Sequence, residues 1–240
     1  MATTSKRSSS RSGARSSTAA NPKASTRSRA KSKAVKPARK AIATARKTAP
    51  SRDRRALGVR ALMPAAPSRD SPHWTDTLSD GTHVLIRPIH KEDAALERAF
   101  IKRLSPESRR LRFLGQMNEA SDELVKALTD IDYRRDMAFV ALVHRDREKR
   151  EIGVARYGTN KDGSVCECAV AVADEWRNRG LGVALMRHLI DVARSRGVRS
   201  MFSVDEADNA AMRDLAKFLG FKRARDPEDA TQVIHTLALQ

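Results

Sequence analysis

Several residue types are scarce in this chain of 240 residues, and each scarcity excludes a class of protein. The only two cysteines lie in Cys166-Glu167-Cys168, so the sequence holds no disulfide framework and favours a reducing, cytoplasmic location. One close pair without a second pair also makes a poor zinc site, so we expect no metal. No apolar run approaches the roughly 20 residues of a membrane-spanning helix. The N-terminus lacks the apolar core of a secretory signal.

Acidic and aromatic residues are almost absent from residues 1–60. This segment contains 18 Lys and Arg, one acidic residue, Asp53, and no aromatic residue, so it carries +17 of the formal net charge of +18. Its few large apolar side chains cannot offset the entropy of ordering, and we predict a disordered basic tail. The charge favours non-specific binding to polyanions such as nucleic acid, but base stacking lacks its aromatic platform. A merely solubilising segment and, less favoured, an organelle transit peptide are the alternatives.

The remaining residues divide into a linker and a domain. Residues 61–80 contain Pro64, Pro67 and Pro72 and are predicted to form a linker; whether Trp74 packs on the domain stays open. Residues 81–240 have nearly balanced charge and regular apolar patterning, and they fit one domain.

Apolar periodicity within 81–240 predicts alternating strands and helices. The predicted strands are 84–88, 137–144, 151–157, 165–173, 198–204, 221–225 and 232–239. The predicted helices are 92–104, one that begins at Pro106 after an N-cap serine, 121–128, 181–196 and 209–219. The fold class is therefore α/β (α+β), with a mixed and mostly antiparallel sheet.

The segment Arg177-Asn178-Arg179-Gly180-Leu181-Gly182 joins a predicted strand to a long amphipathic helix. The first backbone N–H groups of a helix have no acceptor within it, and the helix N-terminus favours an anion. Gly180 and Gly182 remove side chains that would keep a ligand from this backbone, and Arg177 and Arg179 add bidentate donors. We predict a pyrophosphate cradle here; an ordinary turn with solvated arginines is the alternative.

This Arg-x-x-Gly-x-Gly spacing resembles the acetyl-CoA-binding motif of the GNAT acetyltransferases, and the order of elements over 83–239 matches the GNAT fold. Further segments resemble the acetyltransferase domain of the bacterial protein lysine acetyltransferases often called Pat. These segments are 87–89, 92–94, 104–109, 129–133, 153–156, 209–212 and 219–221. The resemblance implies acetyl transfer from acetyl-CoA to an amine, with protein lysines as acceptors. The acyl-CoA-synthetase-like and cyclic-nucleotide domains of some Pat proteins do not fit in 240 residues, so no regulation is carried over.

Glu167 is the candidate general base for this reaction. A lysine amine has a pKa of about 10.4 and must lose a proton before it can attack. Glu167 interrupts an apolar strand, where a glutamate is costly unless it has a partner or a function, and burial there should raise its pKa. The Pat-like domains have their catalytic glutamate at the matching place. A sheet glutamate on a solvated face, paired with an arginine, is the alternative.

The resemblance assigns roles to a few further residues. The backbone near Val170 and Val172 would contact the pantetheine arm, and so would Asn209, which is equally suited to cap a helix. Many GNAT enzymes protonate the leaving thiolate with a tyrosine at the position of Ala216, so no general acid is named here.

Other candidate residues have structural interpretations. His188 is expected to be a surface histidine, and the two cysteines are expected to be small core residues. Asp130, Asp132 and Tyr133 are expected to form a tight turn rather than an acceptor entrance.

Three hypotheses about function stay open at this point. The leading one is a protein lysine acetyltransferase; a small amine acceptor is the rival within enzymes, because a fold does not fix the substrate. The third is a nucleic-acid-associated sensor that binds acetyl-CoA with little turnover. A flexible tail of 60 residues spans roughly 40–45 Å, so the enzyme could also acetylate its own lysines, such as Lys31, Lys33, Lys36 and Lys40.

Overall fold

The computed structural model describes residues 72–115, 119–145 and 147–240. The predictions for residues 1–60, and for the linker before residue 72, lie outside the described residues. Within the described ranges, no helix is long and apolar enough to cross a membrane.

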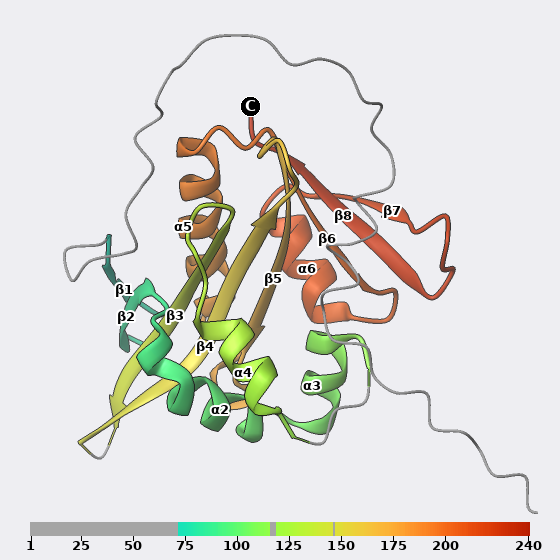
Figure 1. Ribbon diagram of the computed structural model, residues 1–240. Coiled ribbons are helices and arrows are strands. Elements are labelled where there is room, and N and C mark those ends of the chain that lie inside the picture. The colour runs from blue at the N-terminus through green and yellow to red at the C-terminus, as the bar shows by residue number, and fades with distance from the viewer. Residues whose placement is uncertain (1–71, 116–118, 146) are drawn as a thin grey trace, which may run out of the picture. The chain divides into compact units, whose positions relative to one another are not determined.

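An eight-stranded sheet forms the centre of the described chain, with the order β1-β2-β3-β4-β5-β6-β8-β7 (Figure 1). All neighbouring strands are antiparallel except β5 and β6, which are parallel. The strands are β1 Trp74–Thr77, β2 His83–Pro88, β3 Asp136–Arg145, β4 Glu148–Thr159, β5 Val165–Val172, β6 Ser200–Glu206, β7 Lys222–Arg225 and β8 Gln232–Ala238. The predicted mixed, mostly antiparallel sheet is confirmed.

The helices lie between these strands and cover the sheet. They are η1 Lys91–Asp93, α2 Ala94–Arg103, α3 Pro106–Phe113, α4 Asp122–Thr129, η2 Asp174–Trp176, α5 Leu181–Ser195 and α6 Ala210–Phe218. Serine caps start two of them, as the sequence indicates: Ser105 accepts from the Ser108 N–H at 3.2 Å, and Ser121 accepts from the Leu124 N–H at 3.2 Å.

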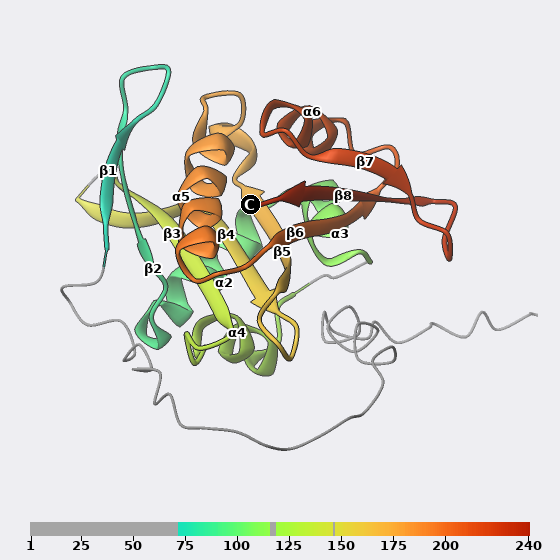
Figure 2. The same cartoon turned by 90° about the horizontal axis from the view of Figure 1, so that it is seen from above.

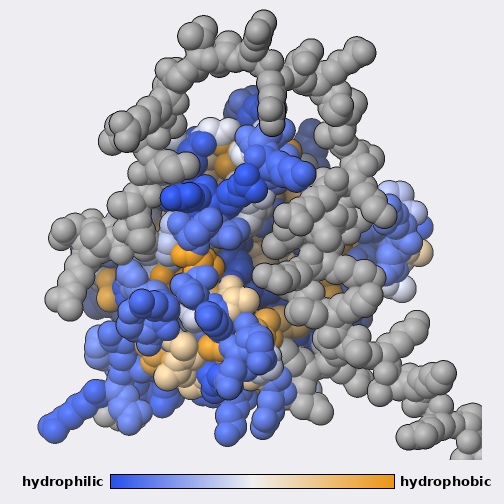
Figure 3. Space-filling view, viewed as in Figure 1, coloured by the Kyte–Doolittle hydropathy of each residue, from blue (hydrophilic) through white to orange (hydrophobic). Residues whose placement is uncertain are grey.

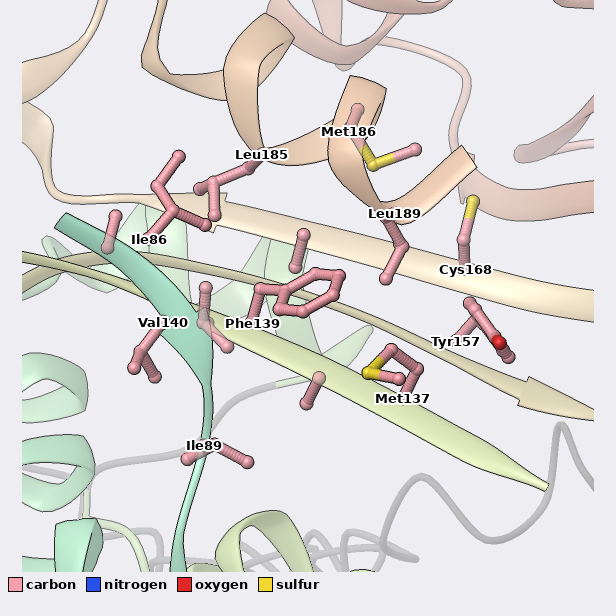
Figure 4. Close-up of a cluster of buried hydrophobic side chains, with 14 of the residues drawn as sticks. Ile86, Ile89, Met137, Phe139, Val140, Tyr157, Cys168, Leu185, Met186 and Leu189 are labelled. Atoms are coloured by element: carbon pink, nitrogen blue, oxygen red, sulfur yellow. The ribbon is translucent and has the colours of Figure 1, made fainter. Parts of the chain in front are cut away.

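Helix α5 packs on the central strands through one apolar face. Leu185, Met186 and Leu189 are buried and lie over Phe139 of β3 (Figure 4). The helix approaches β4 closely because Gly153 has no side chain: a Cβ there would lie 3.1 Å from Leu185 Cδ1 and 3.2 Å from the Ala171 carbonyl oxygen. Each such leucine contributes about 1.5–3 kcal/mol by leaving water, so α5 holds a fixed place relative to β4 and β5.

Strands β5 and β6 separate after a short paired region. Within the described sheet they pair only from Val165 to Glu167, opposite Ser200 to Phe202. Both strands run on beyond that point and diverge (Figure 1). The backbone of β5 after Glu167 therefore faces an opening on this edge instead of a neighbouring strand.

Strand β1 lies within the predicted linker 61–80, and this part of the chain belongs to the sheet. It pairs with β2 from Trp74–Ile86 to Thr77–His83. The Trp74 ring meets Phe139 edge-on, with centroids 5.2 Å apart. The sequence did not predict this strand, because it is only four residues long and lies near prolines. It is an edge strand that is held by contacts with distant residues. The two strands and their turn project together as a hairpin (Figure 2).

Candidate active site

A groove of about 1860 Å³ opens where β5 and β6 diverge. Its walls come from α3, α4, β5, β6, α6 and the start of α5. On the face seen in Figure 3, apolar side chains gather near the middle and hydrophilic ones surround them. This volume exceeds the roughly 300–1,000 Å³ of a typical small-ligand pocket, so the groove has room for an extended organic ligand.

Glu167 lies on β5, half-buried, and its side chain lines the groove. Burial raises the pKa of this carboxyl above its ordinary value, and the nearby Asp205 carboxylate adds to the effect while the Arg112 guanidinium opposes it. Within the described residues Glu167 forms no ion pair, and Arg112 acts on it as a nearby charge. A carboxylate with a raised pKa is a stronger base near neutral pH.

The predicted cradle forms the entry to α5. Gly180 is the N-cap residue with a φ of 87°, and no side chain caps the helix. The first N–H groups of α5 therefore lack acceptors within the helix, and Leu181, Gly182 and Val183 line the groove. At Gly182, a Cβ would lie 3.4 Å from Leu215 of α6 and 3.9 Å from Val172 of β5. Gly180 thus suits the turn because of its positive φ, whereas a Cβ at Gly182 would make only ordinary van der Waals contacts.

The two arginines of the motif are placed differently. Arg177 lines the groove and donates to Ser108 Oγ at 2.7 Å, with Asp174 Oδ1 at 3.2 Å. Arg179 does not line the groove, contrary to expectation. It donates to Asp80 Oδ2 at 2.7 Å and to the Glu175 carbonyl at 2.8 Å. The sequence could not reveal this placement, because Asp80 lies 99 residues away.

The remaining predicted cofactor residues meet at the same groove. Val170 and Val172 line it from β5, and Asn209 lines it from the start of α6. Asn209 also accepts from the Met212 N–H at 3.0 Å, so it does cap the helix. Ala216 is fully buried and brings no hydroxyl group to the site.

The residues with predicted structural roles fall into three groups with different outcomes. The cysteines are buried core residues, as expected. Asp132 accepts from the Arg134 N–H at 3.0 Å, and Tyr133 has a φ of 57°, so the predicted tight turn is present, although Asp130 and Asp132 also line the groove. The expectation for His188 is wrong: its side chain is 18% exposed, and its Nε2 lies 2.8 Å from Asp76 Oδ2.

Sequence reasoning missed the residues that surround the motif from other elements. Arg112 and Ser108 come from α3, and Asp205 comes from β6. A serine and an arginine four residues apart on one helix face were the available signal for α3. Nothing in the local pattern around Asp205 distinguishes it from a solvated acid.

Comparison with known proteins identifies the family of this chain. Residues 104–221 match the model of the Acetyltransferase (GNAT) family. A Pseudomonas aeruginosa protein named acetyltransferase PA5475 is 57% identical over 170 residues, which are 71% of this chain and 91% of that one. The chain belongs to the GNAT acetyltransferase family. It is an acyl-CoA-dependent N-acetyltransferase, which confirms the enzyme hypothesis.

Two further GNAT relatives bear on the substrate. The solved GNAT domain of S. lividans PAT superposes with a TM-score of 0.64 and 25% identity, covering 69% of this chain and 96% of that one. This likeness agrees with the expected resemblance to Pat. The L-methionine sulfoximine/L-methionine sulfone acetyltransferase of Pseudomonas aeruginosa is 34% identical over 110 residues, or 44% of this chain and 63% of that one. The name of this second relative states its acceptors, and these are small molecules.

Proposed function

We propose that the protein transfers an acetyl group from acetyl-CoA to a lysine side chain of a protein, with Glu167 as the general base. One observation carries this proposal: a half-buried carboxylate with a raised pKa lines the same groove as the glycine turn at the start of α5. The carboxylate can accept a proton from the amine, and the glycine turn can hold the pyrophosphate of acetyl-CoA. The proton acceptor and the cofactor site would then lie along one groove.

The residues of the turn fit acetyl-CoA. The N–H groups of Leu181, Gly182 and Val183, together with the helix N-terminus, would hold the pyrophosphate. The unpaired edge of β5 at Val170 and Val172, with Asn209 opposite, would orient the pantetheine arm. When bound, acetyl-CoA supplies the acetyl thioester whose carbonyl carbon forms the new C–N bond as the C–S bond breaks.

Glu167 accepts a proton from the amine. Its carboxylate removes a proton from the lysine ammonium, directly or through one water, and leaves the nitrogen lone pair free to attack. After the C–N bond forms, the nitrogen loses its second proton to the solvent. No tyrosine stands at Ala216 to protonate the leaving thiolate, so the solvent also supplies that proton. A thiol has a pKa of about 8.5, which makes the thiolate an adequate leaving group without an acid.

The charge of the groove supports a cationic acceptor. Acidic side chains outnumber basic ones along its walls, and several are exposed near its rim: Glu123, Asp130, Asp132 and Glu228. Such a rim attracts lysine-rich segments. A small amine is the second candidate, because the relative that acts on methionine sulfoximine and methionine sulfone shares 34% identity over its matched region.

Replacement of Glu167 tests the chemistry. Glu167→Gln should lower kcat by about 10²–10⁴-fold, since the amide cannot accept the proton, while acetyl-CoA binding measured by calorimetry stays within about twofold. Glu148→Gln removes an exposed carboxylate that does not line the groove and serves as the matched control, with kcat near that of the unaltered protein. Equal kcat values for Glu167→Gln and the unaltered protein would refute the assignment.

The acceptor class is tested with a cell extract divided by size. The protein and acetyl-CoA are incubated with the macromolecular or the small-molecule fraction, and release of free CoA is followed. Turnover confined to the macromolecular fraction supports a protein lysine acceptor. Turnover confined to the small-molecule fraction selects the second candidate and leaves the role of Glu167 intact.

A further inference from the structure

We propose that the β1–β2 hairpin positions the acetyl-CoA turn, with Asp80 and Asp76 as its positioning residues. The inference rests on the proposed function, because it gives the turn at the start of α5 the role of a pyrophosphate site. It assigns a task in cofactor binding to residues that composition places in a linker.

The tip of the hairpin holds the turn through Arg179. The Ser79 N–H donates to the Arg179 carbonyl at 3.1 Å, and the Arg179 guanidinium donates to Asp80 Oδ2 at 2.7 Å. The other carboxylate oxygen of Asp80 accepts from the Thr82 N–H at 3.0 Å, which fixes the carboxylate within its own turn. Hydrogen bonding by the backbone and side chain of Thr82, and to a smaller extent by Arg179, holds the pKa of Asp80 below its usual range. Asp80 therefore bridges the two loops as a carboxylate.

The turn needs support of this kind because its backbone is unusual. Asn178 has a φ of 58° and Gly180 a φ of 87°, so left-handed residues flank Arg179 on both sides. A non-glycine residue in this region is uncommon and is retained where its surroundings fix it. Arg179 supplies that restraint, since it also binds the Glu175 carbonyl and lies 4.8 Å from the centre of the buried Trp176 ring.

A second attachment joins the hairpin to the body of α5. His188 lies two turns beyond the cradle, and its Nε2 is 2.8 Å from Asp76 Oδ2 on β1. The Trp74 ring stacks on the His188 ring with centroids 4.1 Å apart. The hairpin thus fixes both the loop that precedes α5 and a point along the helix, and the direction of the free N–H groups depends on both.

A preformed turn binds its ligand more tightly because less conformational freedom is lost on binding. In this arrangement the Arg179 side chain contributes indirectly: it holds the backbone in place and does not need to touch the phosphate. The rival role, in which Arg179 leaves Asp80 to contact the pyrophosphate, predicts the opposite effect of removing Asp80, since the freed guanidinium would then bind the anion more readily.

Calorimetric titration of the full chain with CoA separates these roles. Asp80→Ala should raise the Kd for CoA about threefold to tenfold, the equivalent of one or two lost hydrogen bonds. Asp80→Asn keeps an acceptor for the Thr82 N–H but loses the charge. Its Kd for CoA should therefore lie between those of the unaltered protein and Asp80→Ala. Asp162→Ala is the matched control: Asp162 accepts from the Ser164 N–H at 2.8 Å in another exposed turn, and its removal should leave the Kd unchanged.

Steady-state kinetics and melting temperatures complete the test. The effect of Asp80→Ala should appear in the KM for acetyl-CoA more than in kcat. If Asp80→Ala leaves the Kd for CoA unchanged or lowers it, the inference is overturned. An unchanged Kd together with a lower melting temperature would mean that Asp80 has a purely structural role. A lack of CoA binding by the unaltered protein would refute the proposed function itself, whereas normal binding that ignores Asp80 refutes only the role of the hairpin.

Discussion

Gly153 offers a direct test of how the position of α5 governs the site. A Cβ at this residue would lie 3.1 Å from Leu185 Cδ1, 3.2 Å from the Ala171 carbonyl oxygen and 3.3 Å from Leu181 Cδ2. Two of these neighbours belong to the first turns of α5, and the third is backbone of β5 that cannot rotate away. Gly153→Ala should therefore destabilise the protein by about 1–3 kcal/mol, the usual cost of overpacking a core.

Displacement of α5 should also weaken cofactor binding, since Leu181 begins the helix whose N–H groups form the cradle. Urea denaturation measures the free energy of unfolding, and calorimetry measures the Kd for CoA. Leu185→Ala alone should cost about 2–5 kcal/mol through its cavity, but the added Cβ of Gly153→Ala fills part of that space. The double variant, Gly153→Ala with Leu185→Ala, should thus lose less free energy of unfolding than the sum of the losses in the two single variants. Additive effects, or a Gly153→Ala protein of normal stability, would refute the packing argument.

The remaining predictions concern charge. The acid limb of the kcat/KM profile should reflect a base with a pKa above 4.5, and Arg112→Gln should move that limb to higher pH, because Arg112 stabilises the Glu167 carboxylate; an unmoved limb would exclude Arg112 as an influence. Burial and the neighbouring Glu97 raise the pKa of Glu151, so its contribution to stability is present at low pH and is lost as pH rises above its unfolded pKa; Glu151→Gln should raise the melting temperature at pH 8 and not at pH 4. Deletion of residues 1–60 should abolish salt-dependent retention on duplex DNA, whereas equal retention would place the binding in the domain. Incubation with acetyl-CoA should add acetyl groups to that segment, seen by mass spectrometry of the intact chain and its fragments, and mass unchanged in 1–60 would exclude self-acetylation.

Long periodic segments and local caps are what the sequence could predict. The burial of Leu185, Met186 and Leu189 follows from helical spacing, and Ser105 and Ser121 mark the starts of their helices. The glycine turn was found because its chemistry resides in consecutive residues. Its location along the same groove as Glu167 follows from the sheet, because β5 leads through η2 to the turn.

Contacts between distant segments could not be predicted in this way. The placement of Arg179 depends on Asp80, and the surroundings of His188 depend on Trp74 and Asp76. The pKa of Glu167 depends on Arg112 and Asp205, which come from a helix and a strand with no local mark of the site. The sequence next to each of these residues does not distinguish it from an ordinary surface residue. Its partner is distant in the sequence and is brought close only by the fold.

The edge position of β1 has a consequence for solubility. β1 covers one side of β2 from Thr77–His83 to Trp74–Ile86, and a chain cut at residue 81 would expose the main-chain N–H and C=O groups of His83–Pro88 along that side. An uncovered strand with buried Val84 and Ile86 is a template for pairing with other chains. A protein that begins at residue 72 keeps this cover and should stay monodisperse, whereas one that begins at the boundary indicated by composition should aggregate.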